Sequence, residues 1–370
     1  MNLTGFFPSA KLGWYVARLF LLRSFVILAM LVLVLQTLDL LGESGKILAV
    51  QGNTESDVWH YVALRLPQII ARFLPFSVLL GTILTLVTLN QNSEIISMKA
   101  GGMSAHQILA PLIVASLFVA AISFGFNERF VTRANATLAA WQKVEYAAIP
   151  QVTGVRTNVW VRSGADLIHA QIVSGHGAGA KLDNVEIFHR ADNALATITR
   201  ADHAVIAPGG AARAGWQLAN ARRFDVAAGT TQALGSIIAI PGVTPDRFTL
   251  ASVKGDELGF LPLRAAIHDL KAAGRPTGAL EAALWHKISG PLSAVLMPLL
   301  GAVAGFGLAR SGQLFVRAII GMGLGFAYFV ADNFGLAMGN LGAYPPLLAA
   351  WGPFLLFLMI GEMVLVRSEE

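Results

Sequence analysis

Two ionisable side chains lie inside long apolar runs, where a charge needs a specific reason to be present. Arg72 lies in the run 66–89 and Asp332 in the run 318–340. If both runs cross a membrane, a helix rise of ~1.5 Å per residue places Arg72 ~9 Å and Asp332 ~8 Å from the same membrane face. An unpaired charge at that depth is costly. We therefore expect the two residues to pair, or to share contact with a polar headgroup; the alternative is that Asp332 lines a wet cavity alone.

Arg65 lies seven residues before Arg72 and so on nearly the same face of a helix. It is close to the end of its apolar run, where a long basic side chain commonly extends towards the headgroups without any further role. Phenylalanines near the two deep charges could border a cavity for acyl chains, although facing lipid is the default for each of them alone. The candidate substrate-binding residues are therefore Arg65, Arg72, Phe73, Phe76, Phe329 and Asp332.

A short polar segment, Asn90–Gly102, separates two of the apolar runs. Helical spacing divides it into a polar side that carries Glu94 and an apolar side. The apolar side comprises Ile95, Ile96 and Met98. The segment closes with small residues that let another backbone approach, namely Ala100, Gly101 and Gly102. This pattern is typical of a surface that another protein contacts; the simpler interpretation of Glu94 is a solvated charge in a loop.

No group of residues indicates catalysis. The sequence has no Ser/His/Asp arrangement, no paired carboxylates and no cysteine for a nucleophile, a thiolate metal site or a disulfide. Its histidines are not at metal-ligand spacing. No Walker A sequence occurs, so we expect no ATP site of that kind on this chain. No Lys/Arg run is interleaved with aromatic residues, so nucleic acid is not an expected partner.

The composition predicts a membrane protein with a polar insertion. Of the 370 residues, 55% are hydrophobic and only 13% are charged, with a mean hydropathy of +0.61. Soluble domains of this size are less apolar and carry about twice as many charges. More than half of the charged residues lie between positions 131 and 281. We therefore expect a polar domain inserted between two membrane portions.

Six apolar runs are long enough to cross a bilayer, since ~20 residues of helix span the ~30 Å hydrocarbon layer. They are 19–41, 66–89, 107–127, 286–309, 318–340 and 346–366. Lys and Arg favour cytoplasmic loops, and the short loops that carry them place both termini inside and the inserted domain outside. Glycines spaced four apart in the fourth and fifth runs, including a pair just after Asp332, suggest close helix contacts. The alternative is that this spacing arises by chance in glycine-rich spans.

The sequence divides into four parts. We expect helices one to three in 1–130, with the polar contact segment near 90–104, a β domain in 131–255, an interfacial helix and linker in 256–283, and helices four to six in 284–370. Short alternating runs separated by glycine turns predict the strands, and such a pattern indicates a sandwich, a jelly roll or an open barrel. These runs are Arg156–Val161, Leu167–Ile172, Asn184–Phe188, Ala204–Ala207, Gly215–Leu218 and Ser236–Ile240.

Six pieces of the sequence, in matching order, resemble the lipopolysaccharide export permeases of the LptF/LptG family. The first is the contact segment, two are strands of the β domain, and three lie at or in the last three spans. They are NSEIISMKAGGMS (92–104), VWVRSGADLIHAQIV (159–173), GWQLAN (215–220), LWHKISGPLS (284–293), GFAYFVADNFG (325–335) and YPPLLAAWGP (344–353). The resemblance covers essentially the whole chain and favours the LptG branch over the paralogous LptF branch.

The resemblance implies an α-helical membrane protein with six transmembrane helices and an inserted all-β periplasmic domain, a β-jelly roll. It implies a permease subunit of an ABC transporter, not an enzyme, in the inner membrane of a Gram-negative bacterium. That transporter extracts lipopolysaccharide from the outer leaflet and passes it to a periplasmic bridge. The implied partners are an LptF-like permease, a dimeric cytoplasmic LptB-like ATPase that binds ATP and Mg²⁺, and a bitopic LptC-like jelly-roll protein. Glu94, with the small residues 100–102, matches the place where the family contacts its ATPase.

One stretch departs from the family pattern. The family carries basic residues near the outer end of the first span, where they can meet lipid A phosphates, but residues 36–43 contain none. Just after Pro67, where the family pattern has a basic residue, this sequence has Gln68. Either Lys46, Arg65 and Arg72 supply those contacts, or the lipid A has fewer phosphates.

Two other classes of protein compete with this interpretation. A secondary transporter would need polar residues near the membrane midplane, and the apolar midplane counts against it. A membrane scaffold for envelope assembly would use the β domain but would not need the contact segment. Copurification of a small soluble ATPase separates the permease from both.

Overall fold

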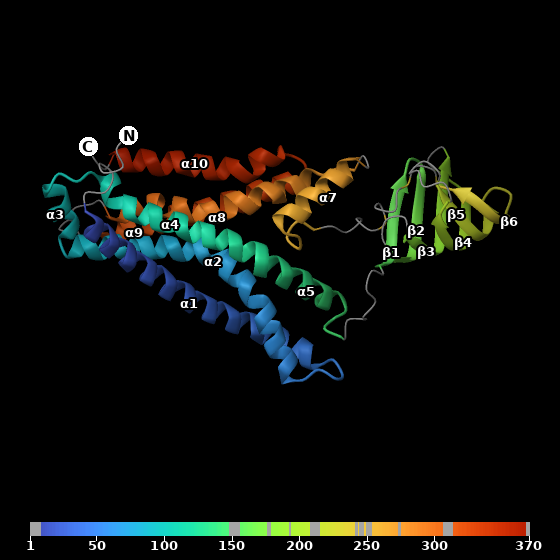
Figure 1. The fold of residues 1–370 in the computed structure, drawn as a ribbon, viewed down its shortest axis with the longest axis horizontal. Helices are drawn as coiled ribbons and strands as arrows, with labels where there is room; N and C mark the ends of the chain where they lie inside the picture. Colours follow the sequence, from blue (N-terminus) through green and yellow to red (C-terminus); the bar gives the residue numbers. More distant parts are fainter. Residues whose placement is uncertain are drawn as a thin grey trace. The chain divides into compact units, whose positions relative to one another are not determined.

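The computed structural model describes most of the chain in two compact units (Figure 1). The described residues are 9–147, 156–175, 179–191, 194–207, 215–240, 243, 248, 254–272, 275–305 and 314–367. The helical unit is formed by Met1–Ile149, Gly255–Arg264 and Gly278–Glu370, and the β unit by Pro150–Lys254 and Ala265–Thr277.

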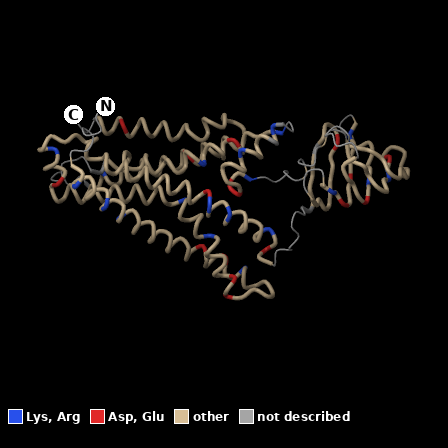
Figure 2. The backbone as a smooth tube through the Cα atoms, viewed as in Figure 1, with Lys and Arg blue, Asp and Glu red and all other residues tan. Residues whose placement is uncertain are grey.

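The helical unit consists of long helices with few charges along their middle portions (Figure 2). In chain order the helices are α1 (Ala10–Leu48), α2 (Glu55–Gln91), α3 (Glu94–Ala100), α4 (Ala105–Phe126), the π-helix η2 (Asn127–Val131), α5 (Thr132–Lys143), α7 (Phe260–Ala272, which begins in this unit), α8 (Gly278–Gly305), α9 (Leu314–Asn340) and α10 (Pro346–Arg367). The first turns of α2 and α4 are fixed by capping boxes, Thr54 with Asp57 and Ser104 with Gln107.

Five helices in the described part of the chain are long and apolar enough to cross a membrane. They are Ala10–Leu48, Glu55–Gln91, Ala105–Lys143, Phe315–Asn340 and Pro346–Val366. They contain five of the six predicted spans. The fourth predicted span, 286–309, coincides with α8 but runs past Gly305 into residues outside the described part, and α8 is not among the five.

α8 lies in the middle of the bundle, where it contacts α2, α4, α9 and α10. The core around it is made of fully buried leucines, among them Leu79, Leu109 and Leu300. Glycines allow the closest approaches, as their spacing predicted. A Cβ added to Gly335 would lie 2.8 Å from the Ala349 carbonyl oxygen, and one added to Gly339 would lie 2.6 Å from the Ala349 Cβ. Close helix contact through small residues therefore joins α9 to α10.

The β domain begins later than the sequence predicted. The sequence predicts residue 131 as its first residue, but the helix of α4 continues through η2 and α5 to Lys143. The extension was missed because its charged residues end the apolar run, although its inner face still buries Leu138 and Trp141. The predicted helix after the β domain is present as α7, and α8 starts at Gly278, inside the predicted linker 256–283.

The β unit is a six-stranded antiparallel sheet whose strands follow one another in chain order (Figure 1). The strands are β1 (Arg156–Ser163), β2 (Asp166–Ser174), β3 (Lys181–Ala191), β4 (Ala194–Ile206), β5 (Trp216–Asp225) and β6 (Thr230–Ala239). Each overlaps one of the six predicted runs, but the runs Ala204–Ala207, Gly215–Leu218 and Ser236–Ile240 cover only one end of β4, β5 and β6. The described strands form an up-and-down meander. The inserted all-β domain is thus confirmed, and the jelly roll stays a prediction that the family resemblance implies.

One face of this sheet forms the core of the β unit. Alternation buries Ile168, Leu182 and Leu218 on that face, together with Trp216. Trp216 packs edge-on against Phe248 and donates its indole N–H to the Val243 carbonyl at 2.8 Å. The residues that follow β6 therefore help to cover the sheet.

Candidate substrate pocket

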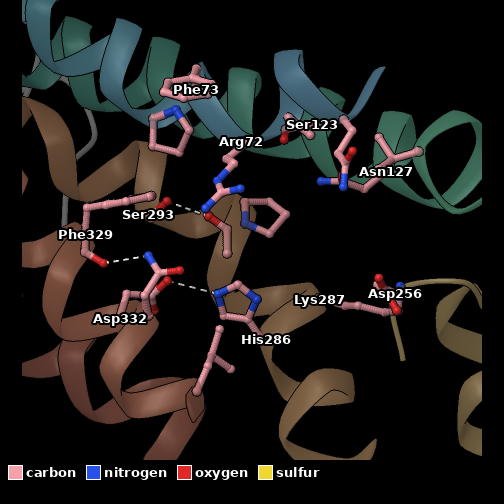
Figure 3. Close-up of a pocket in the computed structure, with 18 of the residues that line it drawn as sticks. Arg72, Phe73, Ser123, Asn127, Asp256, His286, Lys287, Ser293, Phe329 and Asp332 are labelled. Carbon is pink, nitrogen blue, oxygen red and sulfur yellow. Dashed lines mark hydrogen bonds and ion pairs between the residues drawn. The ribbon is translucent and has the colours of Figure 1, made fainter. Parts of the chain in front are cut away.

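The helical unit contains a pocket of about 540 Å³ (Figure 3). α2 forms one wall, η2 with the adjoining turns of α4 and α5 forms the second, and α8 and α9 form the others. Gly255 and Asp256, just before α7, border the same space. The lining is mostly apolar with a few polar and charged groups. This is the usual form of a site that binds a small molecule or part of a lipid.

The α2 wall carries three of the predicted binding residues, Arg72, Phe73 and Phe76. The Arg72 side chain extends from α2 into the pocket (Figure 3). Its guanidinium makes no hydrogen bond or ion pair with any residue that the structure describes. Arginine offers five donors in a planar fork that suits phosphate and carboxylate groups. The pocket therefore presents a free cation beside two aromatic rings.

The opposite wall carries Asp332 and Phe329 on α9, both of which the sequence also singled out. Asp332 does not pair with Arg72. Its Oδ2 lies 3.0 Å from Nε2 of His286 on α8, while its Oδ1 is buried without a hydrogen-bond partner among the described residues. The helix-rise count predicted similar membrane depths for Arg72 and Asp332, and both residues do line the same pocket. The expected pair is wrong because His286, on the central helix, is the nearer partner.

A second cation, Lys287, borders the pocket next to His286. Its ammonium nitrogen lies 3.9 Å from Oε1 of Glu128 on η2, and the two side chains are 13% and 25% exposed. The other carboxylate oxygen of Glu128 accepts the backbone N–H of Phe260 at 2.6 Å. Unlike the Arg72 guanidinium, the Lys287 ammonium is therefore held by a protein group.

Arg65 does not line the pocket. It donates to Asp39 on α1 through Nη2 at 3.0 Å and through Nε at 3.2 Å, and it also contacts Gln68. The Tyr61 hydroxyl donates to the same carboxylate at 2.6 Å. This geometry therefore does not support the prediction that Arg65 binds the substrate. The charge of Arg65 is paired with Asp39, which lies in the stretch 36–43 where the sequence departs from the family pattern.

More pairs follow at the same end of α1 and α2. Lys46 donates to Glu43 at 2.8 Å, and the Tyr146 hydroxyl donates to the other Glu43 oxygen at 2.8 Å. Burial raises the pKa of Tyr146, and the hydrogen bond to Glu43 acts in the same direction. We call these residues, which join α1, α2 and the turn after α5, the hairpin cluster: Asp39, Glu43, Lys46, Tyr61, Arg65 and Tyr146. Lys46 is therefore not a free phosphate ligand either.

The predicted contact segment forms the short helix α3, at the end of the bundle where α1 begins and α10 ends (Figure 1). Glu94 is half-buried, and its Oε1 accepts from the Tyr15 hydroxyl and from the Asn92 amide, both at 3.4 Å. Ile95 is buried and Met98 packs against the core, but Ile96 is 48% exposed. The prediction of a common side was wrong for Ile96, because successive helical residues differ by ~100° and this one points away from the bundle.

Small residues follow on the exposed side of α3. Ala100, Gly101 and Gly102 are all exposed. Gly102 has a φ of 83°, a left-handed conformation that favours glycine, and a Cβ there would meet nothing within 4 Å. α3 therefore presents an exposed surface of one isoleucine and three small residues.

The sequence did not single out several groups that complete the pocket. His286 and Lys287 lay in the piece LWHKISGPLS, which was noticed only as a family resemblance. Ser123, Asn127 and Asn135 come from the segment that was assigned in part to the β domain; all of these residues line the pocket. The sequence did contain a signal for His286 and Lys287, because they are two adjacent basic groups within a predicted span. Ionisable residues inside spans are rare without a function.

Comparison with known proteins agrees with this architecture. Residues 14–367 match the family model described as lipopolysaccharide export system permease LptF/LptG. The chain is 24% identical over 313 residues to the lipopolysaccharide export system permease protein LptG of Escherichia coli K12, which covers 84% of this chain and 85% of the relative. It is also 24% identical over 336 residues to LptG of Haemophilus influenzae, covering 86% and 89%. Both relatives carry the name of the branch that the sequence favoured. The chain is a multi-pass membrane protein that belongs to the LptF/LptG family of lipopolysaccharide export system permeases.

Proposed function

We propose that this chain is the LptG-like transmembrane subunit of an ABC transporter in the bacterial inner membrane. The transporter extracts lipopolysaccharide from the outer leaflet and passes it to a periplasmic bridge. The observation that carries the proposal is the pocket with Arg72, a cation without a protein partner among the described residues and with apolar walls beside it. An anionic headgroup joined to acyl chains is the ligand that such a pocket fits.

Within this pocket, Arg72 binds a phosphate of lipid A through its planar fork. Phe73, Phe76 and Phe329 contact the adjoining acyl chains. Sites of 300–1,000 Å³ accommodate drug-sized ligands. A pocket of about 540 Å³ therefore holds one part of a lipopolysaccharide molecule. The remainder of the lipid lies against the paralogous LptF-like subunit.

The energy comes from a separate dimeric ATPase, which binds ATP and Mg²⁺ and docks on α3 from the cytoplasm. This orientation, with both termini cytoplasmic, is supported by the basic residues of the loops near α3 and at the start of α1. The exposed Ile96 and the small residues 100–102 suit close contact with another protein. Glu94 transmits the movement of the ATPase to α1 through Tyr15 and to α2 and α4, which flank α3.

On the periplasmic side, the β unit passes the lipid on to a bitopic jelly-roll partner. β1 and β6 are the edges of the described sheet. An edge strand has unpaired backbone groups that a second sheet can extend. Strand addition would give the lipid a continuous surface to follow.

The coupling claim is tested by Glu94→Arg and Glu94→Ala in the reconstituted complex. The measurement is ATP-driven release of lipopolysaccharide from proteoliposomes to a soluble acceptor, with assembly checked by copurification of the ATPase. We expect release to be abolished while assembly is mostly retained. Glu55→Arg, an exposed acid at the other end of the bundle, is the matched control and should release normally. Normal release by both Glu94 variants would refute the coupling role.

A further inference from the structure

Glu128 occupies an unusual place, in the single π-helical turn between α4 and α5. Such turns re-aim side chains and are frequent at functional sites. Glu128 Oε2 accepts the N–H of Phe260, the first residue of α7, at 2.6 Å. A carboxylate at this position also stabilises the positive end of the helix dipole. A Cβ on Gly259 would lie 2.8 Å from the same oxygen, so the approach depends on a glycine there.

The same carboxylate also contacts a residue that lines the pocket, Lys287. Its Oε1 lies 3.9 Å from the Lys287 ammonium and has no hydrogen-bond partner among the described residues. Lys287 is mostly buried and lines the pocket, and its side chain extends towards Asp256 (Figure 3). One side chain thus connects a cation of the pocket wall to the first turn of α7.

Three further contacts of this part of the chain involve no charged group. The Asn135 amide reaches the Asp256 carbonyl only at 3.4 Å, and Phe260 meets Phe124 edge-on with 6.5 Å between ring centres. Gly255 packs against Ala283 of α8. The Glu128 hydrogen bond is stronger than the Asn135 contact, since charge-assisted bonds are about twice as strong as neutral ones.

We propose that Glu128 is a positioning residue that makes the attachment of α7 depend on whether the pocket is occupied. The inference rests on the proposed function. An anionic group of the substrate that reaches Lys287 takes the cation from Glu128 and places a second negative charge beside it. Because a partly buried carboxylate is unfavourable next to a like charge, Glu128 moves away and releases the Phe260 N–H. Substrate binding thereby loosens the segment that follows the β unit in the chain.

The absence of cysteine in this chain allows a direct test with two introduced spin labels. Arg129→Cys on η2 and Leu261→Cys on α7 are both exposed, and neither belongs to the Glu128–Lys287 contact. Electron–electron distances are measured in the nucleotide-free complex in nanodiscs, with and without lipopolysaccharide. Retention of fluorescent lipopolysaccharide is measured on the same samples. We expect lipopolysaccharide to raise the population at long distance several-fold.

Two variants distinguish this positioning role from a merely structural one. Glu128→Gln keeps an acceptor for the Phe260 N–H but has no charge, so lipopolysaccharide should no longer change the distance distribution. Lys287→Met leaves Glu128 without its cation, so the long-distance population should be high before lipopolysaccharide is added. Lys143→Met, which removes an exposed lysine at the end of α5, should behave like the unmodified chain.

The possible failures are separable. Retained lipopolysaccharide with an unchanged distance distribution would overturn the role of Glu128 and leave the proposed function standing. A Glu128→Gln complex that still responds to lipopolysaccharide would overturn it as well. Failure of the unmodified complex to retain lipopolysaccharide at all would contradict the proposed function itself, and this inference with it.

Discussion

The hairpin cluster and the pocket both place arginine on α2, seven residues apart, yet the two surroundings differ. In the hairpin cluster, Arg65 meets Asp39, which also accepts from Tyr61, and Lys46 meets Glu43. In the pocket, Arg72 has no partner among the described residues, and Oδ1 of Asp332 and the hydroxyl of Tyr328 are buried without one. Buried polar groups in folded proteins are nearly always hydrogen-bonded.

This difference separates a structural role from a binding role. Charged groups that already pair with other protein groups hold helices together and offer a ligand few unpaired donors or acceptors. Polar groups without a partner among the described residues, as in the pocket, have donors and acceptors that a ligand or water can satisfy. Arg65 and Arg72 are indistinguishable by residue type and helical face, so their partners decide their roles.

Arg72→Ala should have the largest effect, and it should be on binding. A hydrogen-bonded charged contact contributes about 1.5–3 kcal/mol, so we expect lipopolysaccharide retention by the complex to fall roughly 10- to 100-fold. The thermal midpoint should be unchanged, because the guanidinium holds no described residue. Arg129→Ala, an exposed arginine outside the pocket, should retain lipopolysaccharide normally. Equal losses in both variants would remove the distinction between the two arginines.

Arg65→Leu should show the reverse pattern, with lower stability and near-normal binding. Removing one partner of a buried pair costs about 3–5 kcal/mol. Since these side chains are 29% and 22% exposed, we expect roughly 1–3 kcal/mol here. The double variant Asp39→Leu with Arg65→Leu should be less destabilised than either single change, because no lone charge remains. Thermal unfolding in detergent measures this, and additive losses would show that the two residues are not coupled.

The charge swap Arg72→Asp with Asp332→Arg tests whether the two pocket charges act as a pair. Asp332 is bonded to His286, so the exchange should leave His286 facing an arginine and should not restore lipopolysaccharide release lost in the single variants. Release assays on the two single variants and the double variant give the answer. Recovery of release in the double variant would mean that Arg72 and Asp332 meet during transport.

Tyr146→Phe should have the smallest effect. It removes one hydrogen bond to Glu43, worth about 1 kcal/mol. The raised pKa of Tyr146 means that the folded state holds this proton more tightly than the unfolded chain. Its contribution is therefore complete below pH ~10 and is lost as the pH rises above that value. Thermal midpoints measured from pH 8 to 11 should fall less in Tyr146→Phe; parallel curves would contradict this.

Local patterns were enough to predict the strands and most of the spans. Each of the six strand runs overlaps a strand, because alternation and glycine turns are local properties, although the runs for β4, β5 and β6 covered only one end of each. Depth counting placed Arg72 and Asp332 in one pocket, because helix rise is nearly constant. The order in which the described strands pair was not predictable in this way, since local alternation does not encode which strands are neighbours.

The partners of individual side chains could not be predicted from the sequence, for a physical reason. They depend on how each helix is rotated, and periodicity does not fix that rotation against its neighbours. His286 reaches Asp332, and Asp39 reaches Arg65, only because α8 and α1 turn those faces inward. Ile96 shows the same limit on a single helix, since one residue of offset moved it from the core to the surface.

The most direct test of the account is site-specific photocrosslinking to lipopolysaccharide in proteoliposomes. A photoreactive phenylalanine is placed at Phe329, which lines the pocket, and separately at Phe315, an exposed residue of the same helix outside it. We expect crosslinked lipopolysaccharide at position 329, lost when Arg72→Ala is added, and none at position 315. Equal crosslinking at both positions, or crosslinking at 329 that does not depend on Arg72, would contradict it.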